Sequence, residues 1–399
     1  MGNDEQPMIM LSNQIQTLAA KYFETYKQIR HHLHAHPELS YKEYNTAAFV
    51  KGELDKLGIP YQSMAETGVI AVLEGRPSDR VVALRADMDA LPIQEENAVP
   101  YASTIPGVMH ACGHDVHTTC LLGAARILHE LKDQWDGKIK LIFQPGEERN
   151  PGGASILIRE GVLENPRPQH IIGLHVHPLL ETGKVSFAPG KVMASADEIF
   201  ITVRGKGGHA AKPYLTADTI LTASQLIVAL QQLISRNNNP FSPSVLSICS
   251  IQGGFTTNVI PSEVKLMGTF RAMDESWRKE AHLRIHEIAA GIAQAMGASI
   301  DVHIDLGYPS VVNDATLTPQ VKALATDYMG ATQVEDMELS MGAEDFGYYT
   351  QEIPGCFFRL GTGNKAKGIT SNVHTPTFDV DERSIQTGMG MMAFLGATS

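Results

Sequence analysis

The feature that most constrains the fold is an alternation of short apolar strands with helices in two separate parts of the chain. Apolar runs rich in branched residues occupy residues 69–75, 80–87, 138–144 and 170–176, and helical patterns lie between them. This alternation favours a βαβ layout with a largely parallel sheet. The same pattern returns after Gly307, with a helix at 316–328, a strand at 356–360 and a closing helix from about 382.

A different order of elements separates these two parts. Two long helices are expected at about 217–235 and 275–296, and four apolar runs surround them in the order β-α-β-β-α-β. This order is typical of the ferredoxin-like plan. We therefore predict an α/β fold in which a discontinuous domain, residues 1–190 and 306–399, carries an inserted α+β domain at residues 191–305.

Composition excludes several classes of function. The 399 residues carry a formal charge of −12, from 32 basic and 44 acidic side chains, so binding to nucleic acid or to an anionic membrane is not expected. No apolar run approaches the ~20 residues of a membrane span. The acidic N-terminus lacks the stages of a signal peptide, and the four cysteines show no paired spacing, so we expect a cytoplasmic protein.

Polar side chains gather where the predicted strands end. Asp87 and Asp89 follow one strand, Gln144 to Glu148 follow a second, and His175 lies at the end of a third. The segment from Met109 to Asp115 directly precedes a predicted helix. In open α/β sheets the carboxyl ends of the strands meet along one edge, where sites form. We therefore expect these segments to converge on one site.

The residue types at this edge are typical of a metal site. Imidazole, thiolate and carboxylate together suit Zn, Mn, Co or Ni better than Ca or Mg, and Cys112 and His114 flank a flexible glycine. On an extended segment Glu147 and Glu148 would point in opposite directions, so that one binds metal and the other faces the bound water. A metal-bound water and a carboxylate base are the usual groups for amide hydrolysis.

Each of these motifs has an ordinary structural interpretation when it is considered alone. A Cys-x-His pair occurs by chance, two adjacent glutamates are usually solvated, and His175 could be a hydrogen-bonded core residue. Asp87 and Asp89 could simply cap the turn that follows their strand. The metal-site interpretation is preferred because all of these motifs fall at strand ends or helix starts of one predicted sheet.

The inserted domain carries a cluster of its own. His209 follows the glycine-rich turn at 205–208, and Asn258 and Arg271 lie near the ends of other predicted strands. These three side chains could polarise a carbonyl and hold a carboxylate. Two alternatives remain: the turn could bind phosphate, although it lacks the Gly-Lys-Ser/Thr ending, and Arg271 could form a surface salt bridge.

Taken together, these segments resemble the N-acyl-amino-acid amidohydrolases, which include hippurate hydrolases, indole-acetyl-amino-acid hydrolases and bacterial aminoacylases. This family belongs to a broader group of di-metal aminoacylases and carboxypeptidases. The resemblance covers about residues 30–380. The matching segments are, in order, residues 85–92, 109–115, 143–148, 173–176, 205–211, 258–261, 341–346 and 374–379.

The resemblance implies a role for each matching residue. It implies a mixed-sheet hydrolase domain that binds two divalent ions per subunit, with an inserted lid domain that also forms a homodimer or a dimer-based oligomer. Glu147 would be the general base, and Asp89 would orient a ligand. His209, Asn258 and Arg271 would position the substrate. The implied ligands of the two metals are Cys112, His114, Glu148, His175 and His374.

One departure concerns the wider di-metal group. Many of its members carry His-x-Asp where this chain has Asp87-Met88-Asp89. The acyl-amino-acid branch shares this feature and uses Cys-Gly-His instead, so the difference favours that branch. Cys112 would then be an unusual bridging ligand, and its soft thiolate could alter the metal preference.

The sequence therefore predicts a metal-dependent amidohydrolase that cleaves a small N-acyl amino acid into a carboxylic acid and a free amino acid. The nearest alternative is a dipeptidase or aminopeptidase that cleaves short peptides with the same residues. A non-catalytic binding protein would be expected to have lost the base or the ligands, and all of them are present. A phosphate-binding module would rest on Gly205 to Gly208 alone.

Overall fold

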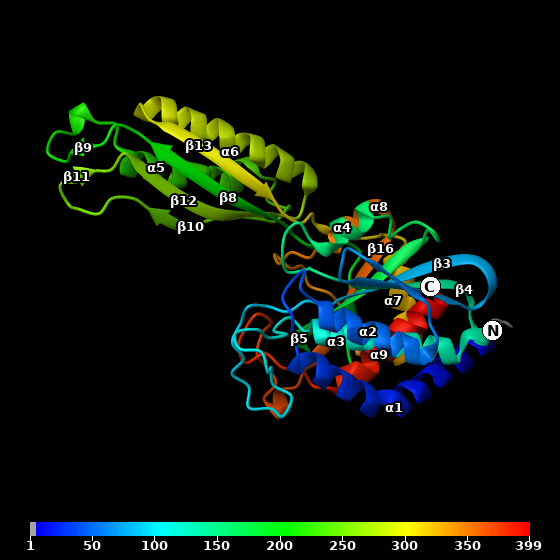
Figure 1. Ribbon diagram of the computed structural model, residues 1–399. Helices are drawn as coiled ribbons and strands as arrows, with labels where there is room; N and C mark the ends of the chain where they lie inside the picture. Colours follow the sequence, from blue (N-terminus) through cyan, green and yellow to red (C-terminus); the bar gives the residue numbers. More distant parts are fainter. Residues whose placement is uncertain (1–4) are drawn as a thin grey trace. The chain divides into compact units, whose positions relative to one another are not determined.

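The computed structural model describes residues 5–399 (Figure 1). The chain divides into two compact units, which are described separately. The first comprises the described residues up to Gly190 together with Val312–Glu338 and Asp345–Ser399, and the second comprises Lys191–Val311 and Leu339–Glu344. Backbone hydrogen bonds from Ala194 N to Ser340 O and Gly342 O, both 3.1 Å, tie the short segment to the second unit.

The first unit is built on an eight-stranded mixed sheet, so the predicted α/β fold with a discontinuous mixed sheet is confirmed. The four strands β4, β3, β5 and β16 are parallel neighbours, whereas β1 and β2 join one edge antiparallel and β6 joins β16 antiparallel. In spatial order the strands are β1 (Tyr61–Met64), β2 (Gly68–Glu74), β4 (Asp136–Gln144), β3 (Arg76–Asp87), β5 (His170–Glu181), β16 (Gly355–Gly363), β6 (Val185–Phe187) and β15 (Val334–Asp336).

Helices cover this sheet, and one apolar core joins them to it. Helices α1, α3 and α9 contact one another, and α4 and α8 contact each other and the strands β4 and β16 respectively (Figure 1). The helices of the unit are α1 (Glu5–Ala35), α2 (Tyr44–Leu57), α3 (His114–Glu130), α4 (Gly153–Arg159), α7 (Leu317–Met329), α8 (Gly347–Glu352) and α9 (Arg383–Thr398).

Two boundaries differ from the sequence prediction in a way that affects the site. Helix α3 begins at His114, four residues before the predicted start, because Gly113 adopts a left-handed conformation that turns the chain into the helix. Strand β5 continues past His175 to Glu181, because it pairs in parallel with β16 beyond that point. His175 therefore lies within a strand and not at its end.

The second unit has its own sheet and its own apolar core. Its four antiparallel strands lie in the order β10-β12-β8-β13, with α5 and α6 packed against them, which is the expected ferredoxin-like arrangement. Helix α5 is shorter than predicted, because a π-helical turn at Leu233–Asn237 follows it. The elements are β8 (Ser195–Arg204), α5 (Thr219–Leu230), β10 (Ser244–Gln252), β12 (Glu263–Ala272), α6 (Glu275–Met296) and β13 (Ser299–Leu306).

Four further short strands complete the structure. In the second unit β9 (Gly208–His209) pairs with β11 (Val259–Ile260), and β7 (Gly190–Met193) and β14 (Val311–Asn313) lie where the chain passes between the units. These pieces and the strands β1, β6 and β15 were not predicted, because two to four residues are too few to show an alternating pattern. Within residues 5–399, no helix is both long and apolar enough to cross a membrane.

Candidate metal centre

Side chains from four distant segments converge at one end of the parallel strands. The ligand atoms of Cys112, His114 and His175 lie within 4.8 Å of one another, and so do those of Cys112, Glu148 and His374. Cys112 belongs to both groups. The structure therefore brings together all five residues that the sequence suggested as metal ligands, as two sets of three that share one sulfur atom.

Backbone conformation explains why a glycine lies close to two of the ligands, Gly113 before His114 and Gly146 two residues before Glu148. Gly113 has φ +82°, and a Cβ atom there would lie 2.5 Å from Val176 Cγ2. Gly146 has φ +61°, and its Cβ atom would lie 2.2 Å from the Tyr41 ring. Only glycine fits both the conformation and the space at these positions. His374 also has a positive φ of 62°, a strained conformation that often marks functional sites.

The hydrogen-bond partners of two histidines determine which ring nitrogen is available. His114 Nδ1 lies 3.2 Å from Asp89 Oδ1, and His175 Nδ1 lies 2.8 Å from the backbone oxygen of Val176. Because both partners can only accept, each Nδ1 carries a proton, which leaves Nε2 as the ring nitrogen that could bind a metal. The His175 Nε2 atom lies 3.5 Å from Cys112 Sγ. Histidines that bind metals are commonly oriented in this way.

The charges of the cluster, and two of its buried atoms that lack hydrogen bonds, fit a bound cation. Burial and the nearby carboxylates of Glu148 and Glu147 raise the pKa of the Cys112 thiol well above its ordinary value. Within the described residues, the buried atoms His114 Nε2 and Glu148 Oε1 make no hydrogen bond. Such atoms are costly unless something binds them. A cation at this position would favour the thiolate and satisfy both atoms.

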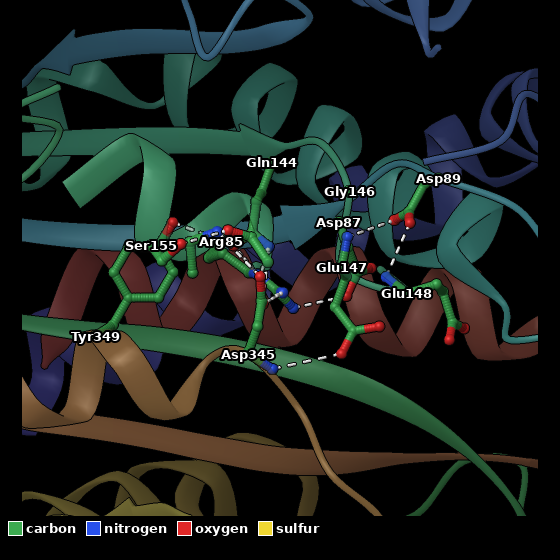
Figure 2. A network of polar contacts seen from close by, with 12 residues as sticks. Arg85, Asp87, Asp89, Gln144, Gly146, Glu147, Glu148, Ser155, Asp345 and Tyr349 are labelled. Carbon is green, nitrogen blue, oxygen red and sulfur yellow. Dashed lines mark hydrogen bonds and ion pairs between the residues drawn. The ribbon is translucent and has the colours of Figure 1, made fainter. Parts of the chain in front are cut away.

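Asp89 connects this cluster to the two glutamates. Its Oδ1 accepts a hydrogen bond from Glu147 N at 3.0 Å, and its Oδ2 accepts one from Glu148 N at 2.9 Å (Figure 2). The same Oδ2 also accepts from Ser40 Oγ at 2.6 Å. The expectation that the two glutamates lie on an extended segment was wrong, because β4 ends at Gln144 and a turn through Gly146 follows. Their side chains diverge because the turn separates them (Figure 2).

Sequence reasoning missed His117, which lies beside the cluster without being available as a ligand. His117 Nδ1 lies 2.5 Å from Asp87 Oδ1, and His117 Nε2 accepts a hydrogen bond from Val176 N at 2.9 Å. Both ring nitrogens are therefore used. Burial opposes ionisation of Asp87, but His114 and Arg85 outweigh it and keep the pKa of this carboxyl well below its usual range. The spacing of His114 and His117, one helical turn, was the available signal.

The three residues suggested for substrate positioning lie in the second unit. His209 and Asn258 are neighbours, because β9 pairs with β11 and Ala210 N donates to Asn258 O at 3.0 Å. Strand β12 begins at Glu263, shortly after β11. Arg271 lies near the opposite end of β12, eight residues or roughly 26 Å along the strand from Glu263. A single chain therefore does not bring Arg271 close to the other two residues.

The local structure decides two of the alternatives raised above. The glycine-rich turn at 205–208 leads into the two-residue strand β9, so it lacks the helix that a phosphate-binding loop requires. Arg271 donates from Nε to Thr269 Oγ1 at 3.2 Å. In the part of the chain that the structure describes, no carboxylate forms an ion pair with it, so its guanidinium group does not serve a surface salt bridge.

The fold and the cluster together define a class of protein. Nitrogen, sulfur and oxygen ligands gather beside the carboxyl ends of β3 and β4 in a mixed sheet, next to Glu147, a buried second carboxylate. This combination is the equipment of a metal-dependent hydrolase.

Comparison with known proteins identifies the family. The profile of the Peptidase family M20/M25/M40 matches residues 83–396. The chain is 45% identical to an N-acyl-L-amino acid amidohydrolase of Geobacillus stearothermophilus over 71% of this chain and 76% of that protein. It is 38% identical to thermostable carboxypeptidase 1 of Saccharolobus solfataricus over 90% and 92%.

A solved structure agrees with this assignment. The YxeP protein of Bacillus subtilis, described as a dinuclear metal-binding peptidase of the M20 family, superimposes with a TM-score of 0.83 at 34% identity, covering 95% of this chain and 98% of that one. The chain belongs to the Peptidase family M20/M25/M40 and is a metal-dependent amidohydrolase.

The shared sulfur atom leads to a prediction about metal binding. Because Cys112 belongs to both sets of ligand atoms, Cys112→Ser should weaken the binding of two ions, whereas His374→Ala should weaken the binding of one. Calorimetric titration of metal-free protein with Zn²⁺ or Co²⁺ measures both stoichiometry and affinity. Cys249→Ser, at an exposed thiol, is the matched control and should bind as the unmodified protein does. Two intact sites in Cys112→Ser would contradict a shared ligand.

A buried carboxyl beneath the turn leads to a prediction about pH. Glu43 Oε1 accepts from Gly146 N at 2.8 Å, and Oε2 accepts from Thr67 Oγ1 at 2.7 Å. Burial, with a contribution from Asp89, raises the pKa of Glu43 to about 7. Its contribution to stability is complete below its ordinary pKa of 4.5 and is lost as the pH rises through about 7.

Replacement of this carboxyl should therefore flatten the pH dependence of stability. A neutral amide keeps the hydrogen bonds of the protonated acid, so Glu43→Gln should match the unmodified protein near pH 5 and exceed its stability near pH 8. Urea unfolding of the metal-loaded protein across this range measures the difference. Glu352→Gln, at an exposed position, controls for the substitution itself. Parallel pH profiles for Glu43→Gln and the unmodified protein would refute the assignment.

Proposed function

We propose that the protein hydrolyses N-acyl amino acids to a carboxylic acid and a free amino acid. The observation that carries this proposal is the convergence of five side chains that can bind metal beside a sixth, buried residue, Glu147. Glu147 belongs to neither of the two ligand sets that contain Cys112. The identity of 45% to an N-acyl-L-amino acid amidohydrolase supports this substrate class.

Two divalent ions occupy the cluster in this proposal. One would be held by Cys112, His114 and His175, and the other by Cys112, Glu148 and His374. Zn, Mn, Co or Ni suits these donors. The bound ions supply Lewis acidity for the scissile carbonyl and a water molecule of lowered pKa.

Glu147 acts as the general base in the proposed reaction. Its backbone N–H is held by Asp89, and only 5% of the residue is exposed, so the carboxylate is kept in a dry environment beside the ligands. It accepts the proton of the attacking water and delivers it to the nitrogen of the leaving amino acid. Asp89 keeps both the glutamate turn and the His114 ring in position for this transfer.

The second unit would supply the groups that recognise the substrate. Arg271 would hold the carboxylate of the amino acid, and His209 with Asn258 would stabilise the oxyanion that develops on the carbonyl. A dipeptide-sized substrate spans roughly 7 Å along its backbone, much less than the roughly 26 Å of strand that separates Arg271 from the other end of β12. Both groups reach one substrate only if they come from two copies of the chain, so we propose a homodimer.

A reducing compartment suits this centre. All four cysteines are free thiols, and Cys112 must remain reduced to bind metal. We therefore propose that the protein works in the cytoplasm.

A second candidate function is the cleavage of short peptides. The 38% identity to a thermostable carboxypeptidase favours it, because the same residues would attack a peptide bond. The two functions differ in the group on the carbonyl side of the scissile amide bond. In an N-acyl amino acid it is an acyl group without an amine, and in a peptide it is an amino-acid residue with a free amine.

The assignment of Glu147 predicts the effect of its replacement. Glu147→Gln should retain the metal content of the unmodified protein, because Glu147 is not one of the proposed ligands, and should lower kcat by at least ~10²-fold through loss of the general base. Steady-state kinetics and elemental analysis of the same preparation measure the two quantities. Normal turnover by a fully metal-loaded variant would exclude Glu147 as the base.

A substrate panel tests the proposed substrate class. N-acetyl and N-benzoyl amino acids should be hydrolysed with higher kcat/KM than unblocked dipeptides of the same amino acid, and the corresponding carboxamides should be poor substrates because Arg271 loses its charged partner. Arg271→Met should remove most of the preference for the acid over the amide. Faster cleavage of the dipeptides would favour the peptidase, and equal rates for acid and amide would exclude the arginine contact.

A further inference from the structure

A second buried network lies beside Glu147 and meets the metal cluster at Asp87, whose Oδ2 lies 3.8 Å from His114 Nε2. Arg85, on β3, is fully buried and donates to three side chains: Asp87 Oδ2 at 2.6 Å, Gln144 Oε1 at 2.9 Å and Asp345 Oδ1 at 2.7 Å (Figure 2). The ion pair between Arg85 and Asp345 joins residues 260 positions apart in the sequence. Neither the metal centre nor substrate recognition, as proposed above, uses Asp345.

Several donors converge on the Asp345 carboxylate. Gln144 Nε2 lies 2.8 Å from both carboxylate oxygens, and Ala154 N in the first turn of α4 donates to Oδ2 at 2.9 Å. Tyr349 in turn donates to Gln144 Oε1 at 3.1 Å. A buried carboxylate with this many donors on fixed elements has a single position, and its own backbone is fixed with it.

That backbone touches the proposed base. Asp345 N donates to Glu147 Oε1 at 3.4 Å, a long hydrogen bond of the kind that catalytic groups often show before substrate binds (Figure 2). One oxygen of the Glu147 carboxylate therefore faces the Asp345 peptide.

The position of Asp345 in the chain makes this contact unusual. Residues Leu339–Glu344 belong to the second unit, and Asp345 is the first residue of the returning first unit. The peptide group that faces Glu147 thus lies at a point where the chain passes from one unit to the other.

We propose that Asp345 is a positioning residue, which fixes the Glu147 carboxylate through the Asp345 backbone N–H. The proposal rests on the proposed role of Glu147 as the general base. Because proton transfer depends steeply on geometry, loss of the anchor lowers kcat and leaves substrate binding largely unchanged.

A double-mutant cycle on the metal-loaded protein tests this inference. Asp345→Asn should lower kcat by about 10- to 100-fold with little change in KM and with unchanged metal content. If Asp345 acts through Glu147, the same substitution should have almost no effect on kcat in the Glu147→Gln background. An equal loss of kcat in both backgrounds would show a merely structural role and would overturn the proposal.

A second variant and a matched control accompany the cycle. Gln144→Met keeps the ion pair but removes the amide donors to Asp345, so it should show a smaller loss that also disappears in the Glu147→Gln background. Asp314→Asn removes another carboxylate of the first unit, one that caps α7, and should leave kcat unchanged. The comparison of Gln144→Met with Asp314→Asn tests the proposal even if Asp345→Asn fails to fold.

A structural measurement separates this inference from the proposed function. Crystal structures of the metal-loaded Asp345→Asn and Gln144→Met variants should show the Glu147 carboxylate displaced or in more than one conformation. An unmoved carboxylate would overturn the inference whether or not N-acyl amino acids are substrates. A displaced carboxylate in a protein that cleaves none of them would support the positioning role and reject the substrate class.

Discussion

The metal centre depends on the carboxylate of Asp89. This one buried group accepts hydrogen bonds from the backbones of Glu147 and Glu148, from the Ser40 hydroxyl and from the His114 ring. It thereby connects the turn after β4 with the first turn of α3 and with the chain before α2. Because the group lies two residues beyond the end of β3, the parallel sheet itself delivers it to this position.

Charge is balanced around this carboxylate by a small number of buried partners. Asp87 is held by Arg85 and His117, and Arg30 and His34 approach Asp115 at 2.8 Å.

Breaking such a buried pair is strongly destabilising because it leaves one uncompensated charge, although an intact pair adds little net stability. The pairs are therefore better understood as devices that fix geometry. Asp115 directly follows His114 on α3, and Asp87 lies two residues before Asp89 on the chain.

Much of the site could be predicted because its residue types are typical metal ligands and because the apolar pattern shows where the strands end. Cys112, Glu148 and His175 fall in or beside apolar runs whose pattern identifies strands or a helix, and the rule for open α/β sheets then brings them together. His374 follows no strand and was assigned through resemblance alone.

What the sequence could not supply is the side-chain pairing across long separations. Nothing local indicates that Arg85 meets Asp345, or that His117 uses both of its nitrogens on Asp87 and Val176. The direction of Glu147 and Glu148 depends on a turn after Gly146, and an extended segment was expected there. The separation of Arg271 from His209 required the register of β12, which no periodicity reveals.

The two ion positions in the proposed centre are not equivalent. The set of Cys112, His114 and His175 offers sulfur and nitrogen from buried side chains, which suits a softer ion such as Zn²⁺. The other set replaces one imidazole by the Glu148 carboxylate, and its His374 side chain is 52% exposed.

Because Glu148 supplies an oxygen donor, the second position suits harder metal ions than the first. Because His374 is exposed, this position also lies closer to solvent. An ion held there would lie closer to solvent than one held by the three buried side chains, and we expect it to exchange more readily.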